Sequence, residues 1–296
     1  MKIILALVRR NTKVFFKDKV MFFSSLITPI ILLVLYGTFL ASLYRMSVEA
    51  AFPPGFGLPD SILDGFVGGQ LVSSILAVSC VTVAFSSNFL MVQDKVVGSI
   101  HDLKIAPIKN SQLALSYYLS SLLATMIVCL SAMAIFLVYL AIVGWYLSFV
   151  DVLLLIFDVF ILVFFGTALS SIINTFLSTQ GQISAVATII SAGYGFICGA
   201  YMPISTFGSG LQKVLMFLPG TYGTSLLRFH ALRGVFKQMA LEQAPAEAII
   251  GLQNGVDYNV YFFDQQVSVH AMYLILIGSI VLFLAIYILI NKLRKR

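Results

Sequence analysis

The sequence predicts an all-α protein that crosses a membrane several times, because of its composition, its hydropathy and its long apolar stretches. Of the 296 residues, 60% are hydrophobic and only 10% are charged, and the mean hydropathy is +1.01. A soluble domain has about 45–50% apolar and ~25% charged residues. A globule of this size has too little polar surface to cover such an apolar excess. The composition therefore excludes an ordinary soluble enzyme and a disordered chain.

Six apolar stretches predict six membrane-spanning helices, since a span needs about 20 mostly apolar residues. The predicted spans are residues 21–43, 65–92, 113–143, 150–177, 183–202 and 271–290. Residues 1–20 are predicted to form an amphipathic helix on the membrane surface, because apolar residues and cations recur there at helical spacing. The alternative is a basic flank that only fixes the topology. We expect one transmembrane domain over residues 1–296.

Lys and Arg gather on one side of the predicted membrane. Thirteen of the 18 lie near the two termini or in residues 93–112, and five lie in the other loops. Cytoplasmic loops carry such an excess. We therefore expect a cell-membrane protein with both termini in the cytoplasm and residues 203–270 outside. The net charge of +6 then reflects topology, and no nucleic-acid partner is expected.

The sequence contains none of the common catalytic or nucleotide-binding motifs. A GxxxxGK[ST] loop, an HExxH pair and a GxSxG elbow are all absent. The three histidines fall on different sides of the predicted membrane, and the three cysteines lie in apolar runs without a CxxC pair. We expect no metal, no directly bound cofactor and no catalytic residue in this chain.

A few polar or small residues inside the predicted spans are candidates for a pore or for helix packing. Asp158 lies well inside a span, where an acid is costly and often functional. We expect it to make a structural hydrogen bond or to line a pore, with a proton relay as the less favoured alternative. Gly195 and Gly199 form a GxxxG pair, and Gly166 lies on a small-residue face. Such faces allow close packing of helices within one chain or between two copies.

Residues 93–112 contain a short motif on the predicted cytoplasmic side. It reads Asp94-Lys95-Val96-Val97-Gly98-Ser99-Ile100-His101-Asp102-Leu103, and Pro107 follows. The stretch suits an amphipathic helix along the membrane face, with charged side chains such as Lys95 in solvent, ended by the proline. It resembles the loop between the second and third spans of type-2 ABC transporter permeases, although that family often has Glu-Arg at His101 and Asp102.

In that family the loop forms the coupling helix, which docks on the ATPase subunit. The resemblance therefore implies that this loop couples the chain to an ATPase. The residues that carry this implied role are Asp94, Gly98, Ser99, Ile100, His101, Leu103 and Pro107.

A second match to the same family follows the fifth predicted span. Pro203 comes first, then Leu211-Gln212, and then Pro219, Thr221 and Arg228. The resemblance implies two short helices that dip back into the outer leaflet, and the glycines and prolines of the segment are compatible with such breaks. We expect Arg228 to anchor the segment at the outer headgroups or to meet an anionic substrate. Alternation in residues 256–263 predicts a small strand or hairpin.

Both motifs, in order on this topology, imply a permease subunit of the type-2 ABC family. Its partners would be a separate ATPase subunit that binds ATP and Mg²⁺, and a second permease copy or a related permease. The loop lacks the EAA pattern of importers, which favours export. We expect a hydrophobic or amphipathic substrate such as a drug, a peptide antibiotic or a lipid. The alternatives are export of a polysaccharide or lipid-linked glycan, and a non-transporting sensor or scaffold.

Overall fold

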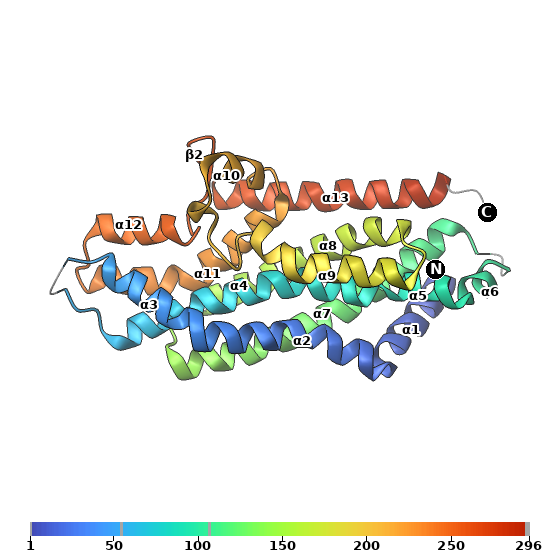
Figure 1. The fold of residues 1–296 in the computed structure, drawn as a ribbon, viewed down its shortest axis with the longest axis horizontal. Coiled ribbons are helices and arrows are strands. Elements are labelled where there is room, and N and C mark those ends of the chain that lie inside the picture. Colours follow the sequence, from blue (N-terminus) through green and yellow to red (C-terminus); the bar gives the residue numbers. More distant parts are fainter. Residues whose placement is uncertain (1, 54–55, 106–107, 294–296) are drawn as a thin grey trace.

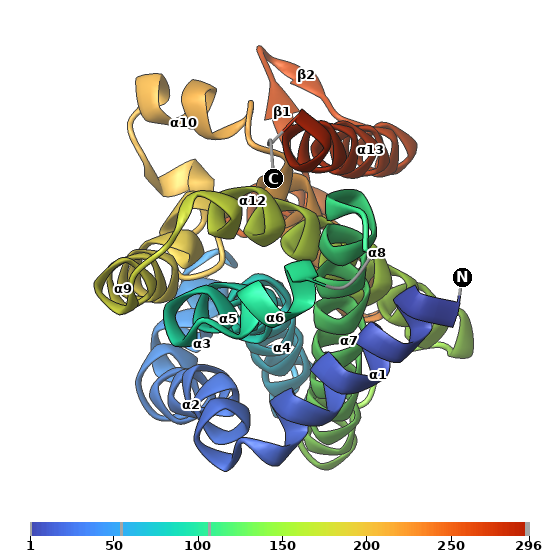
Figure 2. The ribbon, with the colours of Figure 1, turned by 90° about the vertical axis from the view of Figure 1, so that its right-hand side faces the viewer.

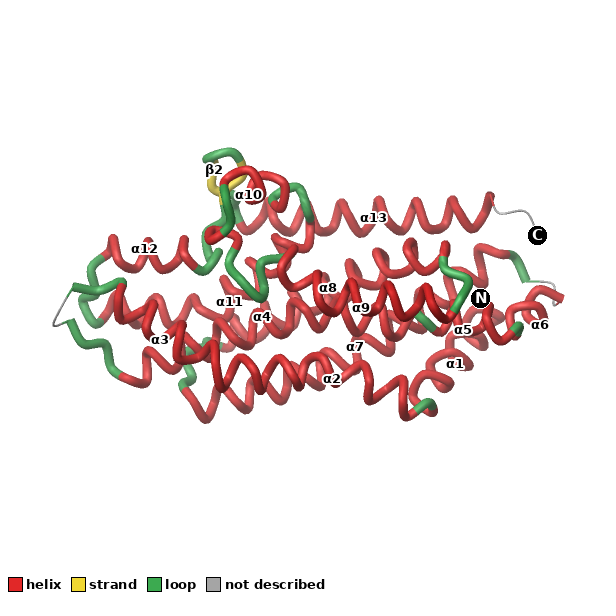
Figure 3. Tube along the Cα trace, in the orientation of Figure 1, coloured by secondary structure: helices red, strands yellow, loops and turns green. Residues whose placement is uncertain are grey.

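The structure is a computed structural model that describes residues 2–53, 56–105 and 108–293. It is an elongated bundle of helices with one small hairpin (Figures 1 and 3). The helices are α1 (Lys2–Lys17), α2 (Lys19–Leu35), α3 (Ala41–Ala50), α4 (Asp60–Asn88), α5 (Leu90–Val97), α6 (Ser99–Ile105), α7 (Asn110–Val143), α8 (Phe149–Phe176), α9 (Gln180–Ile197), α10 (Ser209–Leu215), α11 (Pro219–Leu241), α12 (Ala246–Gly255) and α13 (Val269–Leu293). A π-helical turn, η1 (Tyr36–Leu40), joins α2 to α3, and a 3-10 turn, η2 (Ile204–Thr206), precedes α10. Strand β1 (Tyr261–Phe262) pairs antiparallel with β2 (Gln265–Gln266).

Five helical stretches are long and apolar enough to cross a membrane, which agrees with an all-α protein of several spans. They are Pro29–Ala50, Asp60–Val97, Asn110–Val143, Phe149–Phe176 and Val269–Leu293. The predicted span 183–202 falls on α9, which is not among these five. α9 has 18 residues, about 27 Å of helix at ~1.5 Å per residue, and its first residues are polar. The sixth span stays a prediction.

Helix α4 forms the centre of the bundle. It packs against α2, α3, α7, α8, α9 and α11, and almost all of its residues are buried. Seen end-on, the other long helices are arranged around it (Figure 2). A helix that is apolar all round belongs in such a core, which explains why α4 lacks a polar face despite its length.

Small residues let α8 approach α4 closely. A Cβ atom at Gly166 would lie 2.9 Å from the carbonyl oxygen of Cys80, so a larger side chain does not fit there. Beside this crossing, Asn88 Nδ2 donates hydrogen bonds to the hydroxyls of Ser170 and Ser171, at 3.0 and 2.7 Å. The small-residue face predicted around Gly166 therefore packs within the chain.

Helix α1 has the predicted amphipathic character. Leu7, Val8 and Phe15 are buried, whereas Arg9 and Lys13 are exposed. The buried side packs against α7. The start of α1, the helix α6 and the end of α13 lie at one end of the bundle, and α3 and α12 lie at the other (Figure 1). That the first end faces the cytoplasm stays a prediction.

The segment 203–270 differs from the predicted pair of short helices. α10 has seven residues, but α11 is one helix of 23 residues that packs against α4, α8 and α13. Pro219 lies in the first turn of α11, where a missing N–H costs nothing, so this proline begins a helix. The hairpin expected in residues 256–263 is present slightly later, as β1 and β2.

We expect Gly166→Val to lower the free energy of unfolding in mild detergent by about 1–3 kcal/mol, because the new side chain overpacks the α4–α8 crossing. Gly278→Val is the matched control. Gly278 is also helical, but a Cβ atom at that position would meet no neighbouring atom within 4 Å. Equal unfolding midpoints for the two variants would show that the crossing is not close-packed.

Candidate functional site

The predicted coupling segment forms two short helices, not one. α5 continues the second long helix as far as Val97, and α6 begins at Ser99. Gly98 between them has a left-handed φ of 87°, which ends α5 and which an L-residue adopts only at a cost of about 1–2 kcal/mol. Pro107, the predicted end of the coupling helix, lies outside the described residues.

Asp94 is buried at the base of this segment and joins three helices. Arg10 of α1 donates from Nη1 to Oδ2 at 2.5 Å and from Nη2 to Oδ1 at 3.1 Å. Tyr117 of α7 donates its hydroxyl to Oδ2 at 2.6 Å. The hydrogen bond to Asp94 raises the pKa of Arg10 above its usual value, so the guanidinium stays charged. Two parallel bonds between guanidinium and carboxylate fix orientation as well as distance. We call Asp94, Arg10 and Tyr117 the Asp94 clamp.

Lys95 fixes the same segment to a fourth helix. The sequence predicts Lys95 in solvent, but its Nζ donates to the carbonyl oxygens of Asn174, Thr175 and Leu177, at 3.1, 2.9 and 2.8 Å. These carbonyls lie at the C-terminus of α8, where helical acceptors lack an intrahelical partner and the helix dipole favours a cation. The base of the coupling segment is therefore bound to α1, α7 and α8.

The tip of the segment is turned outward. Ile100 and Leu103 of α6 pack against the core, while Val97 is 78% exposed and Ile105 is 85% exposed. His101 is also exposed. The apolar residues of the segment thus have two roles. Ile100 and Leu103 hold α6 to the bundle, whereas Val97 and Ile105 form apolar surface at the end of the molecule, of the kind that a partner covers.

The second motif surrounds a buried ion pair beside the middle of α4, where Arg228 reaches Ser74. Arg228 is fully buried. Its Nη1 donates to Oδ2 of Asp257 at 3.1 Å, and its Nη2 donates to the carbonyl of Gly199 at 2.5 Å and to the Ser74 hydroxyl at 3.2 Å. Burial raises the pKa of Asp257, and Arg228 opposes that shift. In this structure Arg228 is bonded within the protein, and its predicted roles at headgroups or toward an anionic substrate stay predictions.

The glycine pair of the fifth predicted span does not form a face for helix packing. A Cβ atom at Gly195 would clash with the ring of Tyr201, which folds back over α9. Gly199 lies beyond the end of α9 with a left-handed φ of 74°, and its carbonyl accepts from Arg228. One glycine therefore makes room for a ring, and the other ends the helix.

The remaining motif residues connect α10 to η2 on one side and to α11 on the other. Gln212 Nε2 donates to the carbonyls of Ser205 and Phe207, at 3.1 and 2.6 Å. Thr221 Oγ1 donates to the carbonyl of Leu215 at 2.9 Å. Pro203 precedes η2 at the start of this segment. These hydrogen bonds satisfy backbone carbonyl groups at a tight reversal of the chain, which explains why Gln and Thr occur in the motif.

Asp158 is buried and makes hydrogen bonds to side chains of two other helices. Its Oδ2 lies 2.6 Å from Nδ1 of His230, and its Oδ1 accepts from the hydroxyl of Tyr273. The three side chains come from α8, α11 and α13. Near the start of α8, Asp151 pairs with Arg233 at 2.6 Å. Buried charges thus lie next to partners on other helices.

Sequence reasoning missed these partners: Arg10, Tyr117, His230, Tyr273 and Asp257. A charged residue inside an apolar stretch predicts a residue of opposite charge elsewhere in the sequence as its partner, since a buried charge needs a partner. Among the residues that the structure describes, no group of three or more His, Cys, Asp or Glu is placed to hold a metal ion.

These features define a helical membrane protein with exposed apolar side chains on a short helical segment at one end. The model of the ABC-2 type transporter family matches residues 3–230, which is most of the chain, and the protein belongs to that family. The resemblance to type-2 ABC permeases is thereby confirmed. Neither a curated protein nor a solved structure matches the chain.

We expect Asp94→Asn to lower the free energy of unfolding by about 1–3 kcal/mol, because it removes a charged acceptor from a largely buried pair. A double-mutant cycle of Asp94→Asn with Arg10→Met, measured in mild detergent, should give a coupling energy well above zero. Arg9→Met is the matched control, since Arg9 is the exposed neighbour of Arg10. Equal coupling to Arg9 and Arg10 would contradict the Asp94 clamp.

Proposed function

We propose that this chain is the membrane-spanning subunit of an ATP-driven exporter of hydrophobic or amphipathic molecules. Membership of the ABC-2 family supports a membrane subunit of an ABC transporter that works with an ATPase. The chain has no GxxxxGK[ST] loop, which supports an ATPase on a separate subunit that binds ATP and Mg²⁺ there. In this proposal the chain itself is not an enzyme and binds no cofactor directly.

One observation carries the proposal. The coupling segment exposes apolar side chains at the end of the bundle, while the residues that precede them are bound to neighbouring helices. Val97 and Ile105 present apolar surface at the end of the bundle, in the position where the family docks its ATPase. Directly behind them, the Asp94 clamp and Lys95 bind the segment to three other helices. When two ATPase subunits close on ATP, a push on α6 moves α1, α7 and α8 together, since these contacts leave little room for independent motion.

Two copies of the permease, or this chain and a related permease, would form the path for the substrate. α2 and α9 carry exposed apolar side chains, among them Ile30, Ile31, Ile189 and Phe196. The two helices lie on the same side of the bundle (Figure 2), and α9 contains no charged residue. An apolar face of this kind supports a hydrophobic or amphipathic substrate. The lysine and arginine distribution supports a cell-membrane protein with both termini in the cytoplasm.

We expect Val97→Asp and Ile105→Asp to abolish co-purification of a P-loop ATPase from native membranes and to reduce ATP-dependent transport at least about tenfold, because each places a charge in an apolar contact. Both side chains are largely exposed, so the fold should persist.

Ile250→Asp on α12 is the matched control, with a side chain that is 52% exposed at the other end of the molecule. It should retain the ATPase. Normal recovery of the ATPase with both tip variants, or recovery of the unmodified chain without any ATPase, would contradict the proposed function.

A further inference from the structure

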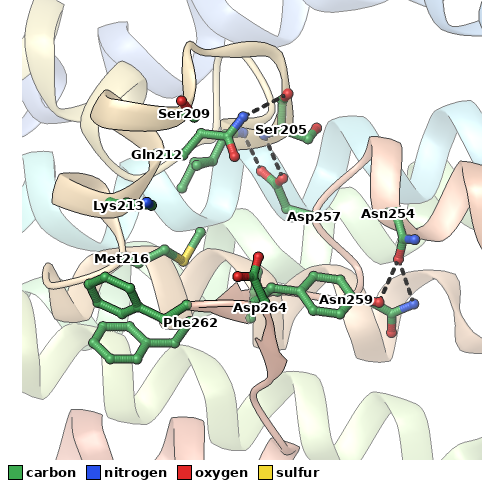
Figure 4. A pocket seen from close by; sticks show the side chains of 14 residues that line it. Ser205, Ser209, Gln212, Lys213, Met216, Asn254, Asp257, Asn259, Phe262 and Asp264 are labelled. Atoms are coloured by element: carbon green, nitrogen blue, oxygen red, sulfur yellow. Dashed lines mark hydrogen bonds between the residues drawn. The ribbon is translucent and has the colours of Figure 1, made fainter.

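A cavity of about 250 Å³ lies on the side of the bundle, between α10 and the hairpin that precedes α13 (Figure 1). η2 and α10 form one wall, and the end of α12 with the β1–β2 hairpin forms the other (Figure 4). The side chains that matter here are those of Gln212, Lys213, Met216, Asp257, Phe262 and Asp264. The hairpin wall follows residue 230, where the family match ends.

Buried contacts fix the floor of the cavity. Asp257 accepts from the backbone N–H groups of Ile204 and Ser205, at 2.6 and 3.2 Å, and from Arg228. Its charge is therefore compensated from within the protein. Gln212 is held by two bonds from its Nε2, and its amide oxygen has no partner among the described residues. The floor and one wall are thus preorganised without a ligand.

Backbone strain is concentrated around the same cavity. Four non-glycine residues of the described chain have a positive φ, and three of them line it: Asp257 (54°), Phe263 (45°) and Asp264 (66°). The last two form the hairpin turn, where Asn-Gly is the favoured pair. Left-handed L-residues cost about 1–2 kcal/mol each. Such strain persists where the surroundings impose it and often marks a binding site.

Two uncompensated charges of opposite sign belong to this cavity. Lys213 projects from α10, and Asp264 stands on the hairpin (Figure 4). Within the described part of the chain, neither of them forms an ion pair with any residue. The Nζ of Lys213 lies 5.7 Å from the ring centroid of Phe263. Met216 and Phe262 add apolar surface. The lining therefore offers a cation, an anion and an apolar wall.

We propose that this cavity binds a small zwitterion, the size of an amino acid or dipeptide with an apolar side group. The carboxylate of the ligand pairs with Lys213, and its ammonium group pairs with Asp264 and the amide oxygen of Gln212. The side group lies against Met216 and Phe262. A ligand with only one charge leaves the opposite protein charge unpaired and binds more weakly. The volume is below the ~300–1,000 Å³ of drug-sized pockets, which limits the ligand to a small metabolite.

The test is a calorimetric titration of the full chain in lipid nanodiscs, with L-phenylalanine and L-alanyl-L-phenylalanine as the ligands. We expect saturable binding of at least one of them. N-acetyl-L-phenylalanine, which lacks the ammonium group, and L-phenylalaninamide, which lacks the carboxylate, should bind about tenfold more weakly or not at all.

Lys213→Met and Asp264→Asn should each weaken binding of the zwitterion about tenfold. Lys237→Met, which changes an exposed lysine of α11 outside the cavity, should leave binding unchanged. Thermal unfolding of each variant checks that the fold is intact. Absence of saturable binding by both zwitterions, equal binding of the blocked analogues, or unchanged binding in both cavity variants would overturn the proposal. None of these outcomes depends on ATPase docking, so the experiment can contradict the zwitterion site without contradicting the proposed transport function.

Discussion

The buried carboxylate of Asp94 determines how the coupling segment relates to the rest of the molecule. A charge removed from water must be paired, and removing one partner of such a pair is strongly unfavourable. Arg10 and Tyr117 supply that pairing from α1 and α7, so three helices are held at one point. The same constraint explains why Arg228 lies against Asp257 and why Asp158 lies against His230. In a bundle this apolar, each buried ion specifies which helices are neighbours.

The coupling segment and the Arg228 ion pair are connected through the central helix. α4 carries Ser74, midway along its length, which accepts from Arg228, and α5 continues almost directly from α4 to Asp94. Arg228 in turn compensates Asp257, which lines the cavity between α10 and the hairpin. A displacement of the coupling segment therefore has a continuous path of packed backbone and charged contacts to this cavity. This path gives the zwitterion site a physical route by which occupancy and the coupling segment affect each other.

Most of the helical fold was predictable, because long apolar runs and cation-rich flanks follow from local composition. The partners of the buried charges were not, since Arg10 and Asp94 are 84 positions apart and only the tertiary fold brings them together. Glycines caused the other differences. Gly98 and Gly199 adopt left-handed φ angles that end α5 and α9, whereas periodicity alone continues a helix through a glycine. Arg228 looked like an exposed anchor, because the alternation over residues 256–263 predicts a strand there but does not show that Asp257 reaches Arg228.

The most direct test of the central claim is a distance measurement between spin labels on α1 and α6 during the ATPase cycle. Lys13→Cys and Asp102→Cys place labels on exposed positions, and the three native cysteines are buried. With one labelled permease copy in the reconstituted transporter, the distance between these labels should stay constant when ATP binds. The distance from residue 102 to a label at Lys237→Cys should change. A change between residues 13 and 102 as large as that to residue 237 would show that α1 and the coupling segment do not move as one unit.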